Sequence, residues 1–142
     1  MMNPEIERAC EKLVLDFAYH SDHQDPAALA ALFIPEGTLI RPNGDTLRGR
    51  DAIRAAYEAR PAGRLIRHLC TNIRVTVESE SEARGLTYAL VLSANASRAP
   101  QAHFGIEMDP RQLVGEFEDS FKRTPEGWRI ASRHARFIMH TV

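Results

Sequence analysis

The chain has 142 residues, the usual size of one domain, and a chain of this length buries roughly 70% of its unfolded surface in a single core. Its 18 Lys and Arg residues and 19 Asp and Glu residues give a formal charge of −1 without a run of five like charges, so nucleic acid and anionic membranes are not expected partners. The N-terminus has acids where a secretory signal needs bases, and no apolar run is long enough to span a membrane, so we expect a cytoplasmic protein.

The first residues predict an amphipathic helix that ends at about Ser21. Asn3 can cap it, and Pro4 suits its first position because a proline there loses no hydrogen bond. Apolar side chains recur at intervals of three and four residues, at Ile6, Cys10, Leu13 and Phe17. A second apolar stripe beside this one ends at Asp22, so we expect the Asp22 carboxylate near the core side of the helix.

A short second helix is predicted next. Asp25 and Pro26 repeat the signal of a cap followed by a proline, and the helix is expected to run through Phe33 until Pro35 and Gly37 stop it. The first two helices should form a helical hairpin.

A small β-hairpin and a third helix follow in the sequence. Short strands are predicted at 38–41 and 46–48, because Asn43 and Gly44 between them supply the positive φ values that a tight turn requires. The third helix is predicted over about 50–59, and a proline and a glycine stop it.

The second half of the chain changes to a period of two. Alternating side chains predict four long strands, at about 65–77, 84–94, 112–123 and 128–140. In the first of them His68, Cys70 and Asn72 are expected to share one face. The segment 95–110 has little periodicity, and we predict a long loop in a position to overhang a pocket.

This order of elements predicts a single α+β domain over residues 1–142. Helices come early and strands late, which favours helices packed on one face of an antiparallel sheet. We expect one strongly bent sheet with the first helix across its concave side. Leucines and valines also face outward from this sheet, so we expect a homodimer that covers them, with a trimer as the alternative.

Five segments, in the right order, carry a resemblance to a known family. They are 19–33, 47–53, 67–72, 115–119 and 127–133. Together they resemble the nuclear transport factor 2-like superfamily, and within it the SnoaL-like group that includes scytalone dehydratase and hexachlorocyclohexane dehydrochlorinase. The resemblance covers nearly the whole chain and implies a cone-shaped fold whose helices and curved sheet enclose a small-molecule pocket. It does not select one reaction, since the superfamily hosts many enzymes and also binding modules.

The resemblance implies a catalytic pair. Asp22 matches the first-helix aspartate of the two lyases named above, and His68 matches the strand histidine that pairs with it. A neutral imidazole can accept a proton at physiological pH, and a carboxylate on its other nitrogen fixes the tautomer and stabilises the imidazolium. The alternative is structural: His68 fills a polar gap in its strand, and Asp22 closes the first helix.

A third candidate is Arg133, which matches an arginine that the dehydrochlorinase is thought to use near its leaving group. The alternative for Arg133 is an ion pair with Asp119 or Glu118 across the last hairpin.

The chain also departs from relatives in this group. Scytalone dehydratase has pocket tyrosines where this chain has Ser21 and either Ile40 or Arg41, so the substrate of that enzyme is not expected. The carboxylates of ketosteroid isomerase have no counterparts either.

No cofactor or metal is expected. His20 and His23 lie three residues apart beside Asp22, but both are expected to point outward, and the sequence places no third ligand. Cys10 and Cys70 lack metal-type spacing and are expected to be small buried side chains with reduced thiols.

These observations predict a cofactor-independent lyase or isomerase that acts on a small, largely apolar, cyclic or polyketide-like substrate. His68 would remove a proton, Asp22 would orient His68, and Arg133 or a loop residue would stabilise the departing charge. Two alternatives stay open: a non-catalytic small-molecule-binding or assembly module of the same fold, and a polyketide cyclase whose base comes from another strand.

Overall fold

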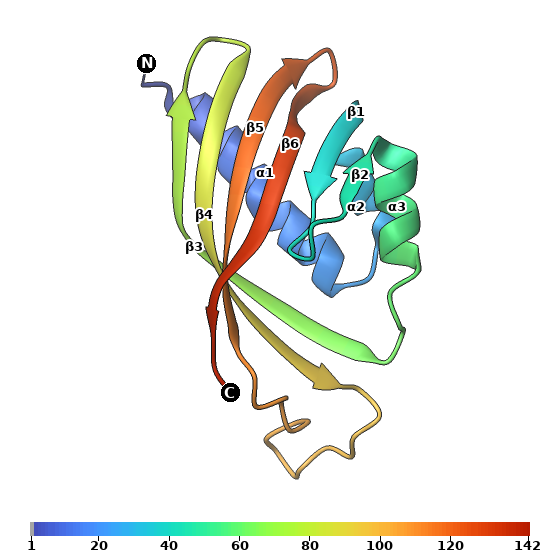
Figure 1. Ribbon diagram of the computed structural model, residues 1–142. Coiled ribbons are helices and arrows are strands. Elements are labelled where there is room, and N and C mark those ends of the chain that lie inside the picture. Colours follow the sequence, from blue (N-terminus) through green and yellow to red (C-terminus); the bar gives the residue numbers. More distant parts are fainter. Residues whose placement is uncertain (1) are drawn as a thin grey trace.

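In the computed structural model, which describes residues 2–142, three helices cover one face of a six-stranded sheet (Figure 1). The elements in chain order are α1 Pro4–Asp22, α2 Pro26–Ala31, β1 Phe33–Ile40, β2 Thr46–Arg48, α3 Arg50–Glu58, β3 Arg64–Val77, β4 Glu82–Asn95, β5 Leu113–Thr124 and β6 Gly127–His140. None of the helices in this part of the chain is long and apolar enough to cross a membrane.

The sheet has the strand order β2-β1-β6-β5-β4-β3. The four long strands β3 to β6 pair in antiparallel fashion, as the alternating pattern predicted. The sheet is mixed, however, because β1 runs parallel to β6, with Phe33 opposite Ile130. Register shifts in the pairings of β3 and β5 mark bulges, which bend and twist strands, and Figure 1 shows the resulting curvature. The curved sheet leaves its helix-covered face concave.

The boundary between α2 and β1 differs from the predicted one. The helix ends at Ala31, and Phe33 begins a strand instead of continuing the helix. Pro35 explains part of this difference, because a proline disfavours helical geometry in the residue before it. Burial explains the rest: Phe33 is fully buried and its ring packs edge-on against Phe17 of α1, with the ring centroids 6.1 Å apart.

The first helix forms as its sequence predicted and buries the first stripe, whereas Leu15 and Tyr19 of the second stripe are exposed. The Asn3 side chain accepts a hydrogen bond from the Ile6 amide at 3.2 Å, and Pro4 occupies the first turn. The predicted stripe is buried, and the buried residues of α1 are Ile6, Cys10, Leu13, Val14, Phe17, Ala18 and Ser21. Figure 1 shows α1 crossing behind β3 to β6, so its last residues lie at one end of the concave space.

A bulge at Asn72 changes which residues of β3 face the core. Asn72 has a φ of 52°, and the pairing with β4 shifts register around it. The sequence predicted Asn72 on the same face as His68, but the bulge leaves Asn72 exposed and returns Ile73 and Val75 to the core. A prediction from strict alternation misses such a shift, because one extra residue moves every later side chain of the strand to the other face of the sheet.

Candidate active site

Asp22 at the end of α1 and His68 on β3 meet on the concave side of the sheet. The imidazole Nδ1 lies 2.6 Å from Asp22 Oδ1, and the His68 backbone N–H donates to Asp22 Oδ2 at 2.9 Å. Both side chains are largely buried, with exposed fractions of 13% for His68 and 7% for Asp22. The single carboxylate therefore fixes both the backbone and the ring of His68.

This contact decides which nitrogen of His68 is available. A carboxylate can only accept hydrogen bonds, so the neutral ring places its proton on Nδ1. The other nitrogen, Nε2, then carries a lone pair and can accept a proton. Asp22 would stabilise the imidazolium formed in that step.

The C-terminal end of α1, which carries Asp22, is tied to the helix that follows the small hairpin. Arg60, just after α3, donates to the backbone oxygen of Ser21 at 3.1 Å and to its hydroxyl oxygen at 3.2 Å. Ser21 is itself buried. The position of Asp22 is therefore set by two contacts from distant parts of the chain, His68 on one side and Arg60 on the other.

His68 borders a cavity of about 280 Å³ between α1, α3 and the sheet. Much of its wall is apolar, including Phe17, Ile66, Ala89, Val91, Phe117 and Phe137. The ring of Phe117 lies close to the imidazole, with the ring centroids 6.4 Å apart. Asp22 does not border the cavity and so lies behind His68. A concave, mostly apolar space with a few polar groups is typical of small-molecule sites.

The long loop after β4 contributes less to the cavity than the sequence suggested. Ser93 and Leu113 border the cavity on either side of it, but none of the described residues between them does. The loop is instead tied to the sheet by Asp109, whose backbone N–H donates to the Ser93 oxygen at 2.8 Å. The described residues of this loop therefore do not line the cavity.

A larger and more open hollow of about 610 Å³ lies on the outer side of the sheet. Polar side chains make up much of its wall, among them Thr38, Arg74, Ser120, Ser132 and His134. It contains neither Asp22 nor His68. We therefore place the candidate site in the smaller cavity, where an oriented base faces an apolar space.

Arg133 is brought near the site but does not border the cavity. Its side chain is fully buried and forms a bidentate ion pair with Asp119. Nε donates to Oδ1 at 2.7 Å, and Nη2 donates to Oδ2 at 2.8 Å. The guanidinium lies between two rings of the cavity wall, 4.3 Å from the centre of Phe17 and 4.0 Å from that of Phe117. Its Nη1 has no hydrogen-bond partner within residues 2–142. The pairing with Asp119 is the structural alternative that the sequence left open.

The sequence did not predict the group of residues that meets at one end of the cavity: Arg60 was not a candidate, and Arg41 was matched to a pocket position only through the resemblance. Tyr57 of α3 packs against the core, as predicted, and also borders the cavity together with Arg41 and Arg60. Both guanidinium groups lie over its ring, with Cζ 5.9 Å from the ring centre for Arg41 and 5.0 Å for Arg60. No spacing rule joins a hairpin turn to the end of a helix, so only the folded chain reveals this group.

The histidines near the end of α1 do not assemble a metal site. His23 makes a 2.8 Å contact from Nδ1 to the Tyr19 backbone oxygen, and its ring stacks on Tyr19. No group of three His, Cys, Asp or Glu residues suited to a metal ion is present in the described part of the chain. Burial raises the pKa of the Cys10 thiol to about 12 and also raises the pKa of Cys70, so both thiols stay protonated at neutral pH.

Known structures share this fold over most of their length. A candidate scytalone dehydratase from Novosphingobium aromaticivorans is 26% identical, with a TM-score of 0.78, covering 94% of this chain and 85% of that one. A candidate aromatic ring hydroxylase from the same organism is 20% identical, with a TM-score of 0.79 and coverage of 98% and 93%. A candidate dehydratase of the nuclear transport factor 2-like family from Streptomyces avermitilis is 19% identical, with a TM-score of 0.80 and coverage of 96% and 99%.

Sequence comparison identifies the family. No curated protein matches the chain. The family model of the SnoaL-like domain, in contrast, matches residues 4–134. That match spans α1 to β6 and includes both Asp22 and His68. Together with the shared fold, it means that this chain belongs to the SnoaL-like domain family.

Proposed function

We propose that the protein is a cofactor-independent lyase or isomerase that uses His68 as a general base on a small, largely apolar, cyclic substrate. The observation that carries this proposal is the 2.6 Å contact between Asp22 and His68 at the wall of an apolar cavity. A histidine that merely filled a gap would not need a carboxylate on both its ring and its backbone. The likeness to a candidate scytalone dehydratase supports a dehydratase-type reaction.

In this mechanism, Nε2 of His68 takes a proton from a carbon next to a carbonyl or opposite a leaving group. The electron pair of the broken C–H bond either forms a double bond and expels the leaving group, which is elimination, or moves along the substrate, which is isomerisation. Asp22 stabilises the imidazolium through Nδ1–H. The imidazolium then returns its proton to a leaving hydroxyl or to a new carbon.

Arg133 has a supporting position in this proposal. Its guanidinium is held by Asp119 and lies between Phe17 and Phe117, so it fixes two rings of the cavity wall. We therefore assign Arg133 as a positioning residue and not as a group that touches the departing atom.

Deuterium exchange tests the proposed function. Small cyclic ketones and β-hydroxy ketones that bind the cavity, identified by shifts of pocket amides in NMR spectra, are incubated with the protein in D₂O. The wild type is expected to exchange the activated C–H or to release water faster than buffer alone, and the His68→Gln variant is not. If every bound ketone keeps its protons in the presence of the wild type, the protein is a binding module.

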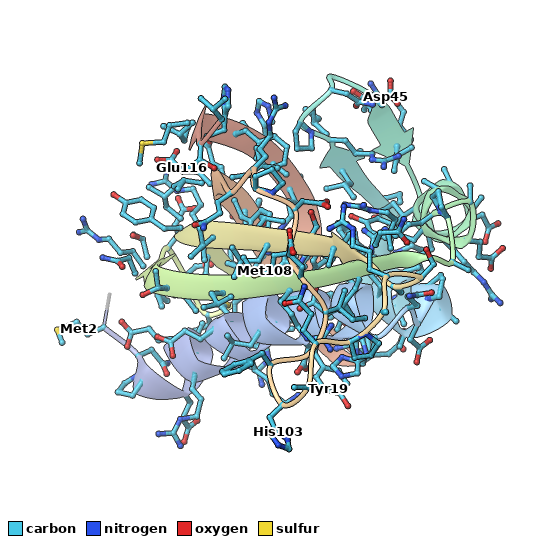
Figure 2. All side chains as sticks on the ribbon, turned by 90° about the horizontal axis from the view of Figure 1, so that it is seen from below. Met2, Tyr19, Asp45, His103, Met108 and Glu116 are labelled. Atoms are coloured by element: carbon cyan, nitrogen blue, oxygen red, sulfur yellow. The ribbon has the colours of Figure 1, made fainter. Side chains whose placement is uncertain are left out.

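We also propose that the outer face of the sheet forms a homodimer. Leu69, Leu90, Val114 and Met139 lie opposite one another across four neighbouring strands. Leu69 and Met139 are 49% and 61% exposed, which leaves apolar surface to cover. In Figure 2, Glu116 of the same face lies on the side of the sheet away from α1. This face is therefore free of the helices.

Light scattering after size exclusion checks the dimer. We expect the wild type to have twice the 16.0 kDa mass of one chain. Leu69→Glu should yield monomers, because it places like charges against each other across a two-fold interface. Phe104→Glu is the matched control, since Phe104 is 92% exposed in the loop between β4 and β5. A wild-type monomer at micromolar concentration contradicts the proposal, and a threefold mass indicates the trimer.

A further inference from the structure

The cavity beside His68 carries an excess of positive charge. Arg41, Arg60, Arg64 and Arg136 all border it, and no aspartate or glutamate does among the described residues of its wall. Such an imbalance is unusual for a site that takes a neutral apolar molecule, because partly buried charges are costly unless they are paired. The partners of the four arginines therefore decide what the cavity can bind.

Two of the four arginines are neutralised within the chain. Arg64 donates to Asp109 at 2.9 Å, and this hydrogen bond holds the pKa of the Asp109 carboxyl below its usual range. Arg136 borders the cavity, but its guanidinium lies on the outer face of the sheet, where it donates to Glu118 at 3.0 Å and lies 3.4 Å from Glu116 (Figure 2). These two side chains have carboxylate partners without any ligand.

The other two arginines have no such partner. Neither Arg41 nor Arg60 forms an ion pair with a carboxylate within residues 2–142. Arg60 donates only to neutral oxygens of Ser21, and Arg41 has no side-chain hydrogen bond in that range. Both guanidinium groups lie over the ring of Tyr57 and are half-buried. One end of the cavity thus has two positive charges without a carboxylate in ion-pair contact among residues 2–142, although Asp25 and Glu58 border the neighbouring pocket on the far side of Arg60 and Tyr57.

We propose that Arg41, Arg60 and Tyr57 bind a carboxylate of the substrate. Guanidinium groups match the two oxygens of a carboxylate in charge and geometry. Burial raises the pKa of Tyr57, so its hydroxyl stays protonated and can donate to the same group. The substrate class is then a small carboxylic acid whose carboxylate lies at this end of the cavity. The rest of the molecule lies against the apolar wall beside His68.

The inference rests on the proposed function in taking this cavity as the substrate site, but its test needs no turnover. The probes are benzoate and its neutral counterpart benzamide, which have nearly the same size. Each is titrated into labelled protein, and pocket amide shifts give the Kd. We expect benzoate to bind at least about tenfold more tightly than benzamide, and added salt to reduce the difference by screening the charges.

Variants assign the binding to the two arginines. Arg41→Gln and Arg60→Gln should each weaken benzoate about tenfold, since a charged hydrogen bond is lost, and leave benzamide unchanged. Arg41 is the cleaner test, because Arg60 also holds Ser21. Arg67→Gln is the matched control: Arg67 is exposed on the outer face of β3 beside His68. It should leave benzoate binding unchanged.

Three results would overturn the inference: equal binding of benzoate and benzamide, an equal loss in the Arg67→Gln control, or tighter binding of phenyl phosphate than of benzoate. The third would replace the carboxylate with a phosphate. His68→Ala should keep benzoate binding while turnover is lost. Failure of the anion test alone therefore leaves the general base in place, and failure of the deuterium exchange test alone leaves the anion site in place.

Discussion

The variants His68→Ala and Asp22→Asn are expected to lose ~10²- to 10⁴-fold in turnover, which is the usual contribution of a positioned proton-transfer group. His68→Ala removes the base itself. Asp22→Asn acts through the tautomer, because the asparagine amide can keep the bond to the His68 backbone with its oxygen while its NH₂ group faces Nδ1. The ring proton then moves to Nε2, where the base is needed.

The measurement is the initial rate on the substrate or on the best deuterium-exchange probe, with the melting temperature recorded for each variant. Asp16→Asn is the matched control, since Asp16 lies on the same helix and, among residues 2–142, pairs only with Lys12 on the surface. The control should keep the wild-type rate. If His68→Ala and Asp22→Asn both keep full activity at an unchanged melting temperature, His68 is not the general base.

The parts of the fold that the sequence predicted well are those governed by local physics. α1 was delimited by a cap, a proline and one apolar stripe, and these signals act within a few residues of one another. The strands β3 to β6 were visible in an alternating pattern. The prediction was wrong at Phe33 and Asn72. There, a distant strand and a bulge override the local pattern.

The candidate site was only partly visible in the sequence. Asp22 and His68 are 46 residues apart, and no spacing rule joins them, so their pairing was predicted only through the family resemblance. The contact in the structure agrees with that prediction. The meeting of the two arginines at the other end of the cavity was not expected: the resemblance placed Ile40 or Arg41 at a pocket position, but nothing joined it to Arg60, which follows a helix. Their proximity depends on how α3 packs beside β1, which local sequence does not encode.

The largest effect on stability is expected at the buried pair of Arg133 and Asp119. Both side chains are fully buried and pair with each other, although Nη1 of Arg133 has no hydrogen-bond partner among residues 2–142. Asp119→Leu leaves an unpaired guanidinium in the core, and Arg133→Met leaves an unpaired carboxylate. Each single variant should therefore lower the free energy of unfolding by about 3–5 kcal/mol. Urea denaturation followed by circular dichroism measures this change.

The double variant Arg133→Met with Asp119→Leu distinguishes the effect of Arg133 on stability from its effect on turnover. It removes both charges and fills much of the same volume, so it should recover a large part of the stability that either single variant loses. Arg136→Met is the surface control, with an expected loss of about 0–1 kcal/mol, because its pair with Glu118 is exposed. If the double variant folds and keeps most of its turnover, Arg133 only holds the rings of Phe17 and Phe117 in place. If it folds and turnover falls as far as in His68→Ala, Arg133 does more for the reaction than hold the two rings, and its assignment as a positioning residue of these rings alone is wrong.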